Sequence, residues 1–222
     1  MRSKSLIHSA AWVFAILGLA TVVEATPITY VQSGIASGMI GGSAFTNALV
    51  QVTVTGDTAN VVSIFAGTAV SNPSSLTTVT IAGVGTATVT DPSAIFSSLT
   101  PIDIDPGNNF PILPYVIIGT LDNPPSLESF TGIGGTGDNA LLGYNLQTSI
   151  GPLTAIPGGV GYPTGLFVHT TLGNLSFTSN VSPTFQGTFT ATVGPVPEPS
   201  SLLLLGSAIA VLVARSHFRT RG

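Results

Sequence analysis

The chain has 222 residues, no cysteine, nine acidic residues and five Lys or Arg residues, which give a formal net charge of −4. All five cations lie near the two ends, so residues 26–195 contain no Lys or Arg, although they hold every acidic residue except Glu24 and Glu198. Without cations this region cannot neutralise phosphates, which excludes nucleic-acid binding, and the lack of cysteine excludes disulfides and thiolate chemistry.

Residues 1–25 have the pattern of a secretory signal peptide. Two basic residues precede an apolar stretch over residues 10–23, and Val23 and Ala25 are small residues at the two positions that signal peptidase recognises. We therefore expect signal peptidase to cleave after Ala25, so that the mature chain begins at Thr26. An uncleaved membrane helix is the alternative, which the short apolar run disfavours.

Residues 26–195 are numerous enough to form one extracytoplasmic domain with a core. Short runs rich in Val, Ile, Thr and Phe alternate with Gly, Pro, Asn and Asp, and no long helical periodicity is present. The run at 48–55 alternates Val with Gln or Thr, which is typical of a half-buried strand, and we expect 60–65 to be its hairpin partner. Further strands are predicted at 76–81, 84–90, 113–121, 140–147, 166–171, 174–179 and 184–193.

The segments between these runs predict one helix and several loops. Asp91 as the N-cap and Pro92 at the first helical position predict a short helix that ends near Leu99. Loops rich in Gly or Pro are expected at 101–114, 132–137 and 150–163. The fold class is therefore all-β, an antiparallel β-sandwich of about ten strands with one short helix. A β-solenoid is the alternative, although the similar Thr-rich runs have no fixed period.

A weak candidate for a calcium site lies in the loop at 101–114. Asp103, Asp105 and Asn108 gather oxygen ligands on a turn, which suits Ca²⁺. Asp and Asn in turns more commonly bind backbone donors, and the remaining ligands of the helix-loop-helix calcium motif are missing. We expect no other metal and no organic cofactor.

His169 is the one histidine of residues 26–195, and a Ser-His-Asp triad would have to use it. The residues just before it, Leu166, Phe167 and Val168, would lie on both faces of a strand and are all apolar. We therefore expect a partly buried histidine with one hydrogen-bond partner. The Gly-x-Ser-x-Gly motif of serine hydrolases is absent, and the further nitrogen or sulfur ligands of a zinc site are missing. The spacing of the acidic residues does not establish the opposed carboxylate pair of a glycosidase. The sequence therefore predicts that the protein is not an enzyme.

Rows of threonine are the most distinctive surface pattern. Thr86, Thr88 and Thr90 share one strand face, and 188–192 contains a second alternating row. Each row repeats its hydroxyl and methyl groups at about 6.6 to 7 Å along the strand. Such arrays resemble the water-ordering faces of some ice-binding β-proteins, whereas the simpler interpretation is that Thr favours strands and supplies polarity in an uncharged domain.

Residues 196–222 consist of three parts in a fixed order. Pro197, Glu198 and Pro199 form a stiff triplet, and 202–214 is an uncharged apolar run that spans about 20 Å as a helix. We interpret this run as a short C-terminal membrane helix. Basic residues beside a span stay on the cytoplasmic side, so the domain before it faces outward. These residues are Arg215, Arg219 and Arg221.

This ending resembles the PEP-CTERM sorting signal of exported bacterial proteins. The resemblance implies recognition by an exosortase, a membrane transpeptidase that would cut at or near the Pro197–Pro199 triplet. The protein would be exported, held transiently at the inner membrane, and then passed to the cell envelope or to extracellular polysaccharide. A plain C-terminal membrane anchor is the alternative for the segment.

For the domain itself we expect a structural or adhesive role in the envelope or extracellular matrix. The alternative is a ligand-binding module for glycan or ice displayed at the cell surface.

Overall fold

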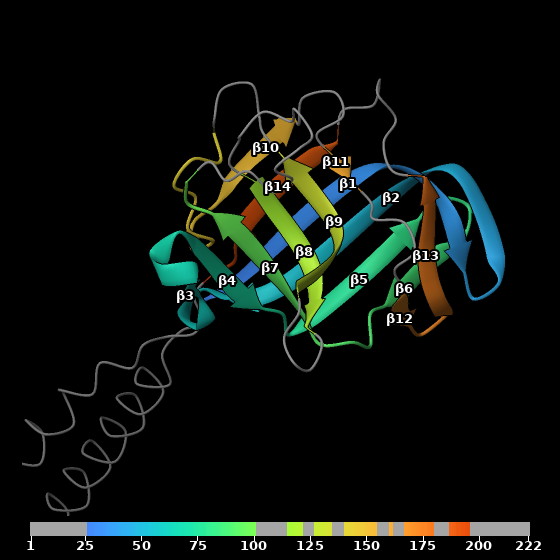
Figure 1. Ribbon diagram of the computed structural model, residues 1–222, viewed down its shortest axis with the longest axis horizontal. Coiled ribbons are helices and arrows are strands. Elements are labelled where there is room, and N and C mark those ends of the chain that lie inside the picture. Colours follow the sequence, from blue (N-terminus) through green and yellow to red (C-terminus); the bar gives the residue numbers. More distant parts are fainter. Residues whose placement is uncertain are drawn as a thin grey trace, which may run out of the picture. The chain divides into compact units, whose positions relative to one another are not determined.

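A computed structural model of the chain describes residues 26–100, 115–121, 127–134, 140–154, 160–161, 167–179 and 187–195 (Figure 1). These residues contain fourteen strands in two antiparallel sheets and two short 3₁₀ helices, η1 (Thr58–Asn60) and η2 (Phe65–Gly67). The all-β prediction is confirmed, and the strands stack as a sandwich rather than a solenoid.

Sheet A, the larger sheet, has eight strands: β1 (Pro27–Ile40), β2 (Ser43–Asp57), β5 (Leu76–Ile81), β6 (Gly85–Thr88), β10 (Ile150–Thr154), β12 (Val168–Thr170), β13 (Gly173–Ser179) and β14 (Thr188–Val193). Sheet B has six: β3 (Val62–Ile64), β4 (Ala69–Pro73), β7 (Ser93–Ser98), β8 (Tyr115–Leu121), β9 (Leu127–Gly134) and β11 (Val160–Gly161). In Figure 1 sheet B lies in front of sheet A. A single cluster of buried apolar residues contains members of both sheets.

The long strand β1 is the centre of sheet A, although the sequence pattern did not predict it. It pairs with β2 along most of its length, and the two strands turn at Gly41 and Gly42, which both have positive φ. Alternate residues of β1 are buried, but Ser and Gly interrupt its apolar residues. The predicted hairpin between 48–55 and 60–65 is wrong, because β3 pairs with β4 in sheet B.

One part of sheet A closes into a ring. The first half of β1 pairs with β14, whereas its last residues pair with β13, which in turn pairs with β12. A bridge between Val89 and Thr170 then joins β12 to the chain just after β6. The ring is therefore β1, β2, β5, β6, β12 and β13. Phe45 and Phe177 pack edge to face in this part of the core, with ring centroids 6.2 Å apart.

The two sheets are also joined by buried hydrogen bonds. The hydroxyl of Tyr30 in β1 donates to the Leu146 carbonyl at 2.6 Å and accepts from the amide of Asn72 in β4 at 2.8 Å. The Gln32 amide donates to the Val116 carbonyl of β8 at 3.1 Å. Burial raises the pKa of Tyr30 to about 12, although the hydrogen bond from Asn72 works in the opposite direction.

A cluster of three hydroxyls connects the sheets at a second place. Ser74, Thr77 and Ser93 form a closed set of hydrogen bonds, with oxygen-to-oxygen distances of 2.8 to 3.0 Å. Thr77 belongs to β5 of sheet A and Ser93 to β7 of sheet B, and both are buried. Because each hydroxyl can donate once and accept at the same time, the set satisfies all three groups without a charge.

Two local predictions are corrected. The helix expected at 91–99 is strand β7, whose six residues are all buried. Because β7 lies between β4 and β8 and is covered on both faces, its sequence lacks the alternation that marks a half-exposed strand. The strand expected at 140–147 is a series of turns in which Gly143 and Leu146 have positive φ.

The loops predicted at 132–137 and 150–163 include strand residues of β9, β10 and β11. The other predicted strands are present: β5 has the predicted bounds, β2 and β13 are longer than predicted, and β6, β12 and β14 are shorter. None of the helical segments within the described ranges has the length and apolar character of a membrane span. The predicted signal peptide and the predicted span at 202–214 lie outside those ranges.

The described domain begins and ends at neighbouring positions. Ile28, near the start of β1, is paired with Val193 at the end of β14. The Gly194 amide then donates to the Pro27 carbonyl at 2.7 Å. Residues 26 and 195 therefore leave sheet A from the same end of two adjacent strands.

Candidate functional site

The outer face of sheet A carries an array of mostly hydroxyl-bearing side chains, interrupted by the apolar side chains of Val31, Leu49 and Leu76. On each of five neighbouring strands the residues of one parity face the core and those of the other parity face outward. None of the outward residues on these strand segments is buried. We define the threonine face by the polar residues among them, together with Val31, which lies between them: Thr29, Val31, Ser33, Gln51, Thr53, Thr55, Thr78, Thr80, Thr86, Thr88, Thr188, Thr190 and Thr192.

The strand register aligns these residues into rows that cross the sheet. One row runs from β14 to β6 through directly paired residues: Thr190, Val31, Thr53, Thr78 and Thr88. A parallel row contains Thr188, Ser33, Gln51, Thr80 and Thr86. Adjacent strands lie about 4.8 Å apart and successive outward residues about 6.8 Å apart, so the rows form a two-dimensional grid.

Hydrogen bonds within the grid hold some of its side chains in place. Ser33 and Thr188 lie 2.6 Å apart between their hydroxyl oxygens, and Thr80 and Thr86 lie 2.8 Å apart. Each such pair still has lone pairs free to accept from a ligand. The threonine face contains no charged side chain, so it offers hydroxyl and methyl groups to a neutral partner. The sequence predicted rows along single strands, and the structure adds their alignment between strands.

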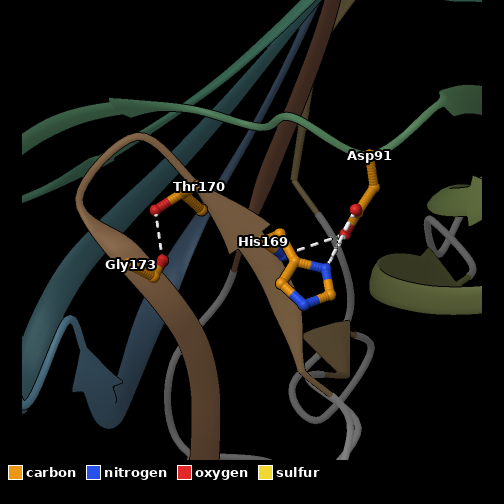
Figure 2. Close-up of polar contacts among 4 residues, drawn as sticks. All are labelled: Asp91, His169, Thr170 and Gly173. Carbon is orange, nitrogen blue, oxygen red and sulfur yellow. Dashed lines mark hydrogen bonds and ion pairs between the residues drawn. The ribbon is translucent and has the colours of Figure 1, made fainter.

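His169 forms the second chemically distinctive group, shown in Figure 2. Its Nδ1 atom lies 2.9 and 3.0 Å from the two carboxylate oxygens of Asp91, and its backbone amide donates to Asp91 Oδ2 at 2.8 Å. The contact is an ion pair when the imidazole is charged. Next to it, the Thr170 hydroxyl donates to the Gly173 carbonyl at 2.6 Å within the β12–β13 turn.

The position of His169 corrects one prediction. Its side chain is 63% exposed rather than partly buried, because it points outward from β12 while Val168 and Thr170 point inward. Asp91, which we predicted to cap a helix, instead binds this histidine across the closure of the ring. An imidazole oriented by a carboxylate is two thirds of a catalytic triad. In the part of the chain that the structure describes, no hydroxyl binds its Nε2 atom.

The other predicted sites lie outside the described residues. These are the calcium candidates Asp103, Asp105 and Asn108, the cleavage site at Ala25, the triplet Pro197–Pro199 and the basic residues Arg215, Arg219 and Arg221. Among the described residues no three His, Cys, Asp or Glu side chains gather in a way that could hold a metal ion.

Sequence comparison supplies the functional assignment of the C-terminal segment. Residues 195–219 match the family model of the PEP-CTERM protein-sorting motif. Neither the curated proteins nor the solved structures contain a significant match to the chain. The motif implies processing by an exosortase and an exported protein that is transiently anchored at the membrane. The chain therefore carries the PEP-CTERM sorting motif of exosortase-sorted proteins, and this motif follows a β-sandwich domain in the sequence.

Proposed function

We propose that this protein is a non-enzymatic component of the cell envelope or extracellular matrix, with a structural or adhesive role. The sorting motif at 195–219 is the observation that carries the proposal, because it directs the attached domain to the cell exterior. Signal peptidase removes residues 1–25, and exosortase cuts at or near Pro197–Pro199. The released domain then stays in the envelope or associates with extracellular polysaccharide.

The threonine face supports an adhesive role. It extends over five strands and bears no charge, and residues 26–195 contain no Lys or Arg with which to attract an anionic partner. A neutral polymer rich in hydroxyl groups fits such a surface, since it can exchange hydrogen bonds with Thr and Ser and pack against the Thr methyl groups. The surroundings of His169 support the non-enzymatic part of the proposal, because among the described residues no hydroxyl binds its Nε2 atom, where a triad would need its nucleophile.

The sorting step is tested by replacing the triplet's acidic residue. Intact mass and cell fractionation would be compared for wild type, Glu198→Ala and the control Ser201→Ala, all expressed in the native host. We expect wild type and Ser201→Ala to begin at Thr26 and to lack the residues after the triplet. Glu198→Ala should stay in the membrane with Arg221 retained. Retention of Arg221 in all three proteins would show a plain anchor instead.

A glycan- or ice-binding module is the second candidate, and the two-dimensional grid of the threonine face favours it. A grid made mainly of hydroxyl groups suits a partner that repeats in two directions, as a crystalline polysaccharide or an ice surface does. The right-handed twist of the sheet, about 20 to 25° per strand, limits the area over which the match can extend.

Thermal hysteresis and glycan pull-down separate this candidate from a purely structural role. Thr80→Lys places a bulky charge within the grid at an exposed position, whereas Thr148→Lys places the same charge at an exposed turn residue outside it. Loss of binding in the first variant alone supports a site on the threonine face. Absence of both activities in wild type leaves the structural role.

A further inference from the structure

Thr26, the residue after the predicted cleavage point, is already fixed to the domain. Its backbone nitrogen donates to Asp57 Oδ1 at 3.2 Å, and its carbonyl accepts from the Thr58 amide at 3.0 Å. The same Asp57 oxygen accepts from the Ala59 amide at 2.8 Å and so caps η1. The start of β1 and the end of β2 are therefore held together through one partly buried carboxylate.

Cleavage after Ala25 changes the chemistry of this contact. Water hydrolyses the amide between Ala25 and Thr26, so that Ala25 gains a carboxylate and Thr26 gains an amine. At neutral pH most α-amines bind a proton, because their ordinary pKa is about 8. The neutral amide that donates to Asp57 in the precursor thus becomes a cation. Because residues 26–195 contain no Lys or Arg, the Thr26 amine and His169 are the only groups of that region that can carry a positive charge.

We propose that removal of the signal peptide creates an ion pair between the Thr26 α-ammonium and Asp57, which stabilises the mature domain relative to its precursor. The inference rests on the proposed export route with cleavage after Ala25. Charge-assisted hydrogen bonds are shorter and stronger than neutral ones, and both Thr26 and Asp57 are partly buried, which reduces screening by solvent. The fold gains this pair only after the chain has been exported and cut.

The composition of the chain permits a clean test. Lys4 is the only lysine, and it lies in the predicted signal peptide. Mild acetylation of the mature protein, followed by hydroxylamine to remove esters, therefore neutralises a single amine. Urea unfolding would be measured for wild type, Asp57→Asn and the control Asp91→Asn, each with and without the acetyl group. Asp91 is also a partly buried carboxylate, but it binds His169.

We expect acetylation to raise the unfolding equilibrium constant of wild type and Asp91→Asn about two- to five-fold and to leave that of Asp57→Asn unchanged. Asp57→Ser, which keeps a capping oxygen, replaces Asp57→Asn if that variant does not fold. An equal effect of acetylation with and without the Asp57 carboxylate overturns the ion pair while the export route stands. A mature chain that mass spectrometry shows to begin at another residue overturns the ion pair together with the proposed cleavage after Ala25.

Discussion

Sheets A and B share the same antiparallel pairing but differ in how their faces are used. The strands of the threonine face alternate between buried and solvent-facing residues, whereas β7 is buried at all six positions and β4 at four of five. In β7, Ile95 belongs to the core shared with sheet A, while Ala94 on the other side of the strand is equally buried. One face of these strands in sheet A is therefore open to solvent, whereas the described centre of sheet B is buried on both sides.

The largest effect is expected when one charge is placed on the outer face of each sheet. Ala94 is fully buried on the side of β7 that faces away from sheet A, so Ala94→Lys should lower the free energy of unfolding by at least about 4 kcal/mol or prevent folding. Thr86→Lys on the exposed threonine face should change it by less than about 0.5 kcal/mol. Urea unfolding compares the two, and similar losses would refute the contrast between the sheets.

The second test compares the two faces within sheet A. Phe189 in β14 is fully buried and packs edge to face on Tyr144, with centroids 6.0 Å apart. Phe189→Ala should cost about 3 to 4 kcal/mol in the free energy of unfolding, because it leaves a cavity. Its neighbour Thr190 faces outward, and Thr190→Ala should cost less than about 0.5 kcal/mol. Calorimetric melting would show whether the Thr190 variant is indeed the milder one.

The ring in sheet A can be tested at the β1–β2 turn. Gly41 and Gly42 both have positive φ, but a Cβ atom at Gly41 would overlap the Leu172 carbonyl, whereas one at Gly42 would meet nothing within 4 Å. Gly42→Ala should cost about 1 kcal/mol from backbone strain. Gly41→Ala should cost about 2 to 3 kcal/mol, because the β12–β13 turn must also move. Equal losses in urea unfolding would mean that the two turns are not packed together.

The smallest expected effect concerns the hydrogen bonds between the sheets. Tyr30→Phe removes the hydroxyl that joins Asn72 to the Leu146 carbonyl and should cost about 1 to 2 kcal/mol at pH 7. Burial raises the pKa of Tyr30 to about 12 from its ordinary value of 10. The stability that the fold gains by keeping Tyr30 neutral is therefore complete below pH 10, and it is lost as the pH rises toward 12. Alkaline titration followed by circular dichroism should find the Phe variant less sensitive in this range.

The contrast between the sheets also explains what could be predicted from sequence. Half-exposed strands such as β2 and β5 alternate clearly and were predicted, but β7 has no polar face, and the Asp-Pro before it resembles a helix start. β1 was missed because Gly and Ser interrupt its apolar alternation, and it is formed by pairing with three strands, β2, β13 and β14. The Thr rows along single strands were predicted, whereas their alignment depends on register.

The partnership between Asp91 and His169 could not be predicted either. The two residues lie 78 positions apart in the chain, and they meet only because the Val89–Thr170 bridge closes the ring. The C-terminal motif was recognisable without any fold, because it is read as a linear order of a triplet, an apolar run and basic residues.

The pairing of Ile28 with Val193 places the first and last strands of the described domain next to each other, so that its two ends lie one strand spacing apart. The same geometry allows the natural ends to be joined and new ones opened at an exposed turn such as Gly83, a circular permutation that keeps every strand in place.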